Sequence, residues 1–234
     1  GFCLVGSEMC IRDRRDEGEI VLGTETTTLD AAGEIAATHD MSGVTDDQVR
    51  AEANRLTGDL MQVPPMVSAI KIDGKRLHEL AREGKEVDRP PRPVRVDRFD
   101  VEPVEGARGV WRCVVDCSSG TYIRSLAADL GTALGGGAHL RSLRRTSVGG
   151  FTLDDAGTIE SPTLLPISAA VQHLESALVD EDTAALVGHG RVLPLEQLQV
   201  SGAGPWAVLG EHGALLAVYE SHPQGGKPTV VIPR

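Results

Sequence analysis

Strand-like and helix-like segments alternate along residues 19–145, and glycine or proline marks many of the junctions between them. Residues 19–38 alternate in a strand-like way about a polar turn at 30–33, a pattern that predicts a hairpin. Thr45 and Gln48 stand at the two positions of a capping box, which predicts that a helix begins there. This mixture of elements predicts an α+β fold in which helices cover a mixed sheet.

The middle of the chain adds shorter elements to this pattern. Val63-Pro64-Pro65 forces an extended segment, because a residue before proline is driven away from helical conformations. Further expected elements are a strand at 68–72 that closes on the Asp73-Gly74 turn, a helix at 76–82, paired strands at 94–96 and 110–117, a helix at 125–134, and a glycine stop at 135–137.

The last part of the chain changes character. From about residue 180 onward, short strand-like segments predominate, and they predict a small β-rich domain resembling a half-barrel. The expected strands lie at 191–193, 206–209, 215–219 and 229–232. Residues 1–15 share no apolar period with the rest of the chain, so we expect a non-native leader there, with a poorly ordered native terminus as the alternative.

Composition limits the class of protein. A chain of 234 residues with 41% apolar side chains can bury one substantial core and a smaller domain. No apolar run reaches the ~18 residues that a membrane-spanning helix needs. The four cysteines form no disulfide framework, and Cys113 and Cys117 lack the partner pair of a metal site. We therefore expect a reduced, cytoplasmic protein that binds no metal.

The charge of the chain is unevenly distributed. A net charge of −11 argues against a generic nucleic-acid binder, since contacts to phosphate come from lysine and arginine. Residues 51–150, however, carry 16 basic and 13 acidic side chains, whereas both flanks are strongly acidic. An acidic protein can still present one basic face.

The segment Ser119-Gly120-Thr121-Tyr122-Ile123-Arg124 is the first candidate for a site. In an extended segment, side chains two apart point to one face, so Tyr122 and Arg124 are expected to enter one cavity. Such a pair suits a site that stacks a flat base on the tyrosine and holds a buried carboxylate with the arginine. We expect that no carboxylate of this chain pairs with Arg124 in this way. The alternative is a strand-end aromatic ring beside a surface arginine.

Three ordered blocks of sequence carry a resemblance. They contain Leu22-Gly23-x-x-Thr26-x-Thr28-x-Asp30-x-x-Gly33-Glu34, then Val63-Pro64-Pro65-Met66-x-Ser68-Ala69-x-Lys71-x-x-Gly74-Lys75-Arg76-Leu77, then Gly120-Thr121-Tyr122-Ile123-Arg124 with Leu140-x-x-Leu143-Arg144-Arg145. Over about residues 17–160 the chain resembles the bacterial tRNA pseudouridine(55) synthase family, TruB. The acidic tail resembles the PUA-like C-terminal domain of some members.

The resemblance implies an RNA-modifying isomerase that works without cofactor or metal. It detaches the uracil of one T-loop uridine in tRNA from C1′, rotates it, and rejoins it through C5. The base must first leave its stack. Residue by residue, Tyr122 matches the tyrosine that packs against the target uracil, Arg124 matches the arginine paired with the catalytic aspartate, and Leu143 matches an apolar contact to the nucleotide.

One family motif has no match. The nucleophilic aspartate of the family lies in Gly-Thr-Leu-Asp-Pro-x-Ala-Thr-Gly, which this sequence lacks. Thr28-Leu29-Asp30 imitates it without the proline, and Asp30 stands only 33 residues before Val63. We therefore expect that Asp30 is not the nucleophile, that the fold is truncated at its N-terminus, and that this chain alone is inactive. Val67 also replaces the family's usual aromatic residue.

Basic side chains near these motifs are candidates for RNA contact. They are Lys71, Lys75, Arg76, Arg141, Arg144 and Arg145. Alternatively, Lys71, Lys75 and Arg76 only keep an exposed strand edge soluble. The alternative for Arg141, Arg144 and Arg145 is that they form the solvent-exposed face of a helix.

These observations combine into one expected organisation. We expect a leader at 1–15, a partial pseudouridine synthase catalytic domain at 16–160, a helical linker at 161–179 and a PUA-like domain at 180–234. The expected partner is the T-arm stem-loop of tRNA, and the expected state is a monomer that contacts no membrane. The alternative function is a noncatalytic RNA-binding fragment.

Overall fold

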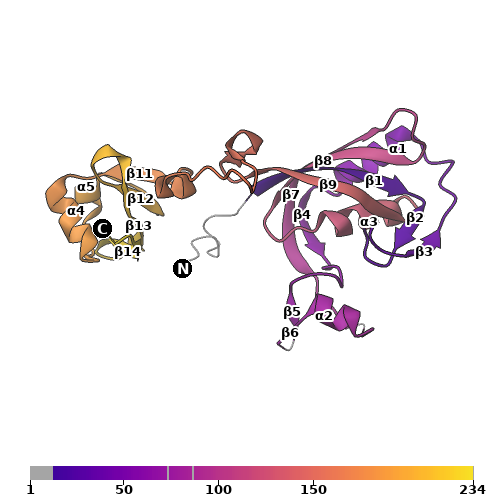
Figure 1. The fold of residues 1–234 in the computed structure, drawn as a ribbon, viewed down its shortest axis with the longest axis horizontal. Helices are drawn as coiled ribbons and strands as arrows, with labels where there is room; N and C mark the ends of the chain where they lie inside the picture. The colour runs from indigo at the N-terminus through magenta and orange to yellow at the C-terminus, as the bar shows by residue number, and fades with distance from the viewer. Residues whose placement is uncertain (1–12, 73, 86, 234) are drawn as a thin grey trace. The chain divides into compact units, whose positions relative to one another are not determined.

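The computed structural model describes residues 13–72, 74–85 and 87–233 (Figure 1). The described chain divides after Leu153 into an N-terminal unit and a C-terminal unit, each with its own core. This division falls before the expected boundary at 160, because residues 154–179 cluster with the C-terminal unit.

A six-stranded sheet organises the N-terminal unit, with strand order β10-β9-β1-β8-β7-β4. All its neighbouring strands run antiparallel. The strands are β1 (Asp13–Leu22), β4 (Gly58–Gln62), β7 (Arg92–Pro103), β8 (Val110–Ser118), β9 (Ala138–Val148) and β10 (Phe151–Thr152). Together with the helices that pack against it, this sheet confirms the expected α+β class, but its strands are antiparallel and do not form the mixed sheet that was expected.

Strand β1 lies inside this sheet and begins earlier than expected. Arg14 pairs with Cys117 of β8 and with Val148 of β9, and its side chain is buried. Residues 13–15 of the expected leader are therefore part of β1 and pair within the sheet. The rest of the expected leader lies outside the described residues.

Two helices pack against the sheet. The capping box at Thr45 and Gln48 is present and starts α1 (Asp46–Arg55), as predicted. Helix α3 (Ile123–Ala133) follows β8 and buries Leu126 and Leu130. The core between helices and sheet is largely aliphatic, with Trp111 among its few aromatic rings.

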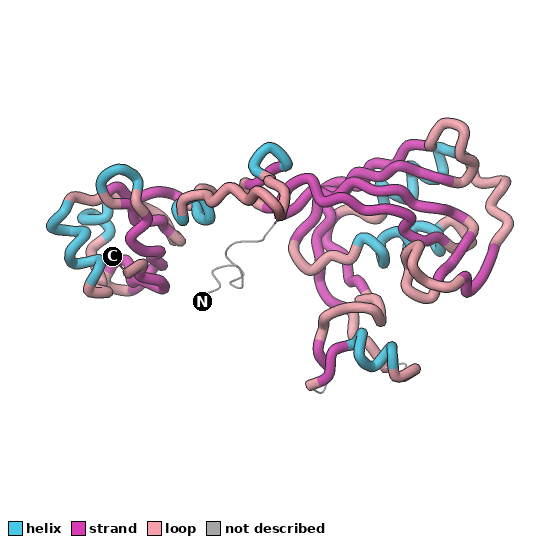
Figure 2. Tube along the Cα trace, viewed as in Figure 1, coloured by secondary structure: helices cyan, strands magenta, loops and turns pink. Residues whose placement is uncertain are grey.

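Two small hairpins complete the N-terminal unit. A hairpin is present within 19–38, but its strands are β2 (Thr24–Thr26) and β3 (Ile35–Thr38). The expected first strand at 19–22 is the end of β1 and pairs with β8 and β9 instead. A second hairpin consists of β5 (Lys71–Ile72) and β6 (Lys75–Arg76), so the strand predicted at 68–72 is shorter than expected. Helix α2 (Leu77–Arg82) follows this hairpin, and the hairpin and α2 together stand apart from the six-stranded sheet (Figure 2).

The basic segment at 139–145 is a strand, so the alternative of a solvated helix face is wrong. Leu140 and Leu143 stand three apart, which suggests a helix, yet they pair with Ile20 and Gly18, which stand two apart. A register shift in the β1–β9 ladder accounts for the extra residue. The irregularity hides the period of two that normally identifies a strand.

The C-terminal unit has a four-stranded sheet in the order β11-β12-β13-β14. Its elements are β11 (Glu175–Leu178), α4 (Glu181–Gly188), α5 (Leu195–Leu198), β12 (Trp206–Leu209), β13 (Leu215–His222) and β14 (Gly225–Val231), with short 3₁₀ turns at Leu153–Asp155, Ile167–Val171 and Glu211–Gly213. β11 pairs in parallel with β12, so the expected linker at 161–179 supplies a strand. The strand expected at 191–193 is reduced to one bridge between Leu193 and Gly226.

Cys113 and Cys117 are buried in the core of the N-terminal unit and carry free thiols. Burial raises the pKa of Cys113 to about 12 and also raises the pKa of Cys117. Within the described ranges, no group of three or more histidine, cysteine or acidic side chains is arranged to hold a metal ion. In the same ranges, no helix is long and apolar enough to cross a membrane.

Candidate uridine pocket

The candidate segment 119–124 connects β8 to α3. Gly120 has a φ of +82°, which glycine adopts without strain, and Thr121 Oγ1 donates to the carbonyl of Ser118 at 3.0 Å. Tyr122 is the N-cap of α3 in an extended conformation, and Arg124 already lies in the first turn of the helix. The expectation that one extended segment presents both side chains is therefore wrong, since the helix begins between them.

The guanidinium of Arg124 joins three segments of the chain. Its Nη1 lies 3.0 Å from Asp30 Oδ2 and donates to the carbonyl of Thr28 at 3.3 Å. Its Nη2 donates to the carbonyl of Val67 at 2.8 Å. The side chains of Arg124 and Asp30 are 22% and 27% exposed, so the pair is largely withdrawn from water. A carboxylate of this chain thus does occupy the place beside Arg124, contrary to our expectation.

Asp30 is held rigidly from its own loop. Its Oδ1 accepts from Thr28 Oγ1 at 2.6 Å and from the N–H of Ala32 at 3.1 Å, while Arg124 takes Oδ2. The flanking backbone forms a bridge with β9, because the N–H of Ala31 donates to the carbonyl of Leu140 and the N–H of Leu140 donates to the carbonyl of Leu29. Sequence reasoning missed this pair because its residues stand 94 apart.

Side chains hold the proline-containing segment after β4. Both prolines lack an N–H, so this stretch cannot form a full sheet ladder. Ser125 donates instead to the carbonyl of Val63 at 3.1 Å, and Arg89 donates to the carbonyl of Pro64 at 3.0 Å. With the hydrogen bond from Arg124 to Val67, these contacts fix the proline-containing segment against α3 and against the loop that carries Arg89.

A pocket of about 530 Å³ opens beside the Arg124–Asp30 pair, a volume in the ordinary range for small-molecule sites. Its lining residues are Asp30, Ala31, Ala32, Arg124, Leu140, Arg141, Ser142 and Leu143. Leu143 is 46% exposed and offers an apolar surface there. The structure thus brings together Arg124, Leu143 and Arg141 of the predicted residues, whereas Tyr122 is half-buried and stands outside the lining.

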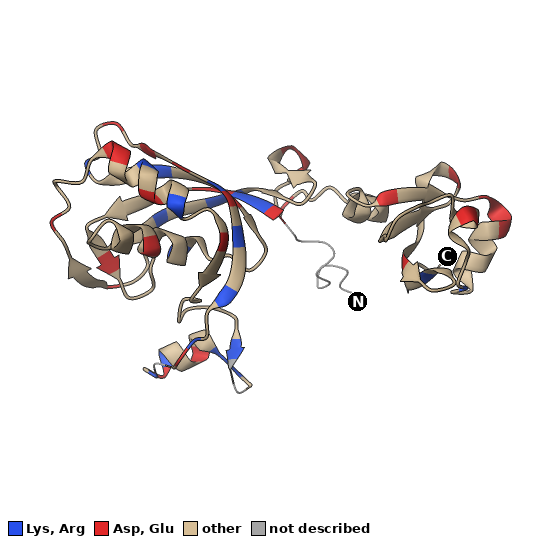
Figure 3. Cartoon of the chain, turned by 180° about the vertical axis from the view of Figure 1, so that it is seen from behind, with Lys and Arg blue, Asp and Glu red and all other residues tan. Residues whose placement is uncertain are grey.

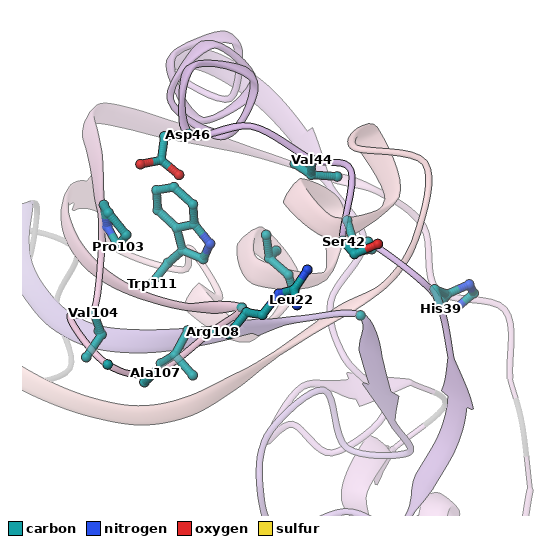
Figure 4. Close-up of a pocket in the computed structure, with 15 residues that line it drawn as sticks. Leu22, His39, Ser42, Val44, Asp46, Pro103, Val104, Ala107, Arg108 and Trp111 are labelled. Atoms are coloured by element: carbon teal, nitrogen blue, oxygen red, sulfur yellow. The ribbon is translucent and has the colours of Figure 1, made fainter.

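A second pocket of about 640 Å³ lies in the same unit (Figure 4). It is formed by the chain around His39 and Ser42 together with the β7–β8 hairpin, and Trp111 lies within it. Leu22 and Gly23 of the first motif block line it, but none of the candidate catalytic, substrate-binding or RNA-contact residues does. The smaller pocket beside Arg124 is therefore the better candidate for the site.

The basic candidates lie in two places. Lys71, Lys75 and Arg76 are exposed on the β5–β6 hairpin, and Lys75 lies 3.4 Å from Glu83. On β9, Arg141 lies 3.5 Å from Glu19, Arg145 lies 3.0 Å from the buried Asp16, and Arg144 is exposed. Figure 3 shows basic residues both on the long strands and on the hairpin.

Comparison with protein families gives two consecutive matches. Residues 7–123 match the TruB family pseudouridylate synthase N-terminal domain, and residues 124–198 match the tRNA pseudouridylate synthase B C-terminal domain. Among solved structures, a Cbf5-Nop10-Gar1 complex and an archaeal box H/ACA Nop10-Cbf5 complex match with TM-scores of 0.65 and 0.67. They are 22% and 18% identical, each match covers 97% of this chain and 69% of the other, and they show the fold alone.

Curated relatives are more similar in sequence. A protein named tRNA pseudouridine synthase B from Rhodococcus jostii is 44% identical, and the match covers 91% of this chain and 72% of that protein. The protein of the same name from Corynebacterium glutamicum is 45% identical, over 88% of this chain and 75% of the relative. With both family domains matched in order and relatives more than 40% identical over most of its length, the chain belongs to the TruB family of pseudouridylate synthases.

Proposed function

We propose that this chain supplies the uridine pocket of a tRNA pseudouridine synthase that acts on the T-loop uridine at position 55. One observation carries the proposal: Asp30 fixes the guanidinium of Arg124 at the edge of a pocket that Leu143 lines. A planar, permanently charged group held in one geometry can orient a carboxylate beside a bound base.

The reaction sets clear demands on such a pocket. The C1′–N1 bond of the uridine breaks, the uracil turns, and a C1′–C5 bond forms while C5 loses its proton and N1 gains one. The product is therefore an isomer of the uridine, and the free base must be retained. We propose that Leu143 contacts the nucleotide in the pocket and that the ring of Tyr122, which stands outside the pocket lining, packs against the flipped uracil from the adjoining start of α3. Stacking on an aromatic ring is worth about 1–3 kcal/mol per base, which helps to offset the cost of flipping.

Asp30 is proposed as the partner of Arg124 and not as the nucleophile. Both of its carboxylate oxygens already accept hydrogen bonds from Thr28, Ala32 and Arg124. The sequence also lacks the Gly-Thr-Leu-Asp-Pro motif that carries the family's nucleophile. We infer that this chain by itself binds the substrate but does not turn it over.

The proposed partner is the T-arm stem-loop of tRNA. Lys71, Lys75 and Arg76 present positive charge on the β5–β6 hairpin, and Arg141 lines the pocket itself. Arg144 and Arg145 extend this charge along β9. A single chain provides all of these groups, so the proposed binding state is a monomer, and the proposed tRNA substrate supports a cytoplasmic location.

The expected result of a binding experiment is a salt-dependent preference for the T-arm hairpin over a scrambled hairpin of equal length. Removing two phosphate contacts with Lys75→Ala and Arg76→Ala should reduce the slope of log K against log salt by about 1.5. The control is Lys227→Ala, an exposed lysine of the C-terminal unit, which should leave the slope unchanged. Equal affinity for the T-arm and scrambled hairpins at all salt concentrations would contradict the proposed substrate.

A further inference from the structure

Gln62 occupies an unusual position in the sheet. It is the last residue of β4, the edge strand of the sheet, and stands directly before the proline-containing segment. Its side chain is nevertheless buried, with only 4% of the residue exposed. A buried carboxamide must find hydrogen-bond partners within the protein, since burial without them is costly.

Both ends of this carboxamide bond to one residue, Tyr122. Gln62 Oε1 accepts from the Tyr122 N–H at 2.7 Å, and Gln62 Nε2 donates to the Tyr122 carbonyl at 3.2 Å. The two contacts fix the orientation of the amide, because only its oxygen can accept from an N–H. Residues 62 and 122 are 60 apart in sequence, so this clamp joins β4 to the start of α3.

The clamp acts at the junction between the turn and the helix. Tyr122 is the N-cap of α3, and its side chain makes no capping hydrogen bond. Its carbonyl also accepts the first helical bond, from the N–H of Leu126 at 3.0 Å. Gln62 therefore fixes the backbone from which the Tyr122 ring projects, two residues before the Arg124 guanidinium.

We propose that Gln62 is a positioning residue for uridine recognition: it holds Tyr122 so that its ring can pack against the flipped base. The inference rests on the proposed function, because it assigns Gln62 a role only if this pocket receives a uracil. Gln62 itself reaches no substrate atom in this scheme and acts through the backbone of Tyr122. Substitution of Gln62 should therefore lower the contribution of the flipped base to the binding affinity and leave the contacts between the protein and the RNA phosphates unchanged.

The test compares two T-arm hairpins, one with the target uridine and one with an abasic nucleotide in its place. For each protein, the ratio of the two affinities isolates the contribution of the base. The full chain should prefer the uridine hairpin by about tenfold or more, as stacking of one base predicts. Gln62→Met, which keeps the side-chain length but removes both hydrogen bonds, should reduce this ratio about five- to tenfold.

A matched control separates positioning from general loss of structure. Gln48→Met removes another glutamine with a defined structural role, the capping box of α1, and should leave the ratio unchanged. Circular dichroism verifies that each variant is folded. An overall loss of stability would weaken binding to both hairpins alike and leave the ratio of the two affinities unchanged. A misplaced Tyr122 would lower only the affinity for the uridine hairpin.

Gln62→Glu supplies a second readout through pH. A protonated carboxyl can both accept and donate, as the amide does, whereas a carboxylate can no longer donate to the Tyr122 carbonyl. Burial favours the neutral form of a carboxyl group. The ratio for Gln62→Glu should therefore approach that of the unsubstituted chain as the pH falls from about 8 to about 5, in the range where a buried carboxyl titrates.

The outcomes separate the two proposals. A full chain without preference for the uridine hairpin overturns the proposed function, and the role of Gln62 with it. A full chain with that preference, together with an unchanged ratio in Gln62→Met and no pH effect in Gln62→Glu, overturns only the role of Gln62. A reduced ratio in Gln62→Met with pH-dependent recovery in Gln62→Glu supports both.

Discussion

Gly131→Ala is expected to lower the free energy of unfolding of the N-terminal unit by about 3 kcal/mol. Alanine in place of a helical glycine normally stabilises by about 1 kcal/mol. Here the added Cβ would lie 2.4 Å from the backbone nitrogen of Ala138 and 2.4 Å from the carbonyl carbon of Gly137. Backbone cannot move aside as a flexible side chain can, so α3 must separate from the start of β9.

Urea unfolding followed by hydrogen exchange and mass spectrometry measures this effect, because peptides of the two units are read separately. Gly188→Ala is the matched control: it also replaces a helical glycine, at the end of α4, where a Cβ would meet nothing within 4 Å. It should change stability by no more than about 1 kcal/mol, in the stabilising direction. A Gly131→Ala protein as stable as the unsubstituted chain would contradict the close packing of α3 on β9.

Arg124→Ala is expected to cost about 2–3 kcal/mol of stability and to remove the preference for the uridine hairpin. The substitution leaves the largely buried carboxylate of Asp30 without its charged partner and frees the carbonyls of Thr28 and Val67. Arg124→Lys should retain part of the stability, because an ammonium keeps the charge but cannot bond three separated acceptors in the geometry of a guanidinium.

The same urea titration and the two-hairpin comparison measure both effects of Arg124→Ala. Arg144→Ala is the control on neighbouring strand β9, where the side chain is exposed and the expected change in stability is within about 0.5 kcal/mol. If Arg124→Ala and Arg144→Ala behaved alike in both measurements, Arg124 would be an ordinary surface arginine.

Local signals in the sequence predicted local structure well. Thr45 and Gln48 stand three residues apart, so the capping box that starts α1 could be identified without any knowledge of tertiary contacts. The strand expected at 110–117 is likewise present as β8, and it pairs with β7 as predicted. In contrast, the register shift in the β1–β9 ladder disturbed the period around Leu140 and Leu143, and this strand was not recognised.

The candidate site could be predicted only in part, because it is assembled from distant segments. The motif around Arg124 identified the guanidinium, and the family resemblance added Leu143. The partner of Arg124 depends on the bridge that docks the Asp30 loop on Leu140, which no local pattern reveals. The clamp between Gln62 and Tyr122 is equally hidden, since a glutamine at the end of an edge strand looks like a solvent-exposed residue.

The most direct test is pseudouridine formation on a T-arm stem-loop, with this chain alone and with the chain joined to a family segment that contains Gly-Thr-Leu-Asp-Pro. We expect product at the T-loop uridine only from the joined protein, and none from its Arg124→Ala variant, because we propose that the pocket lies in this chain and the nucleophile in the added segment. Turnover by this chain alone that Asp30→Ala abolishes would contradict this assignment and identify Asp30 as the nucleophile.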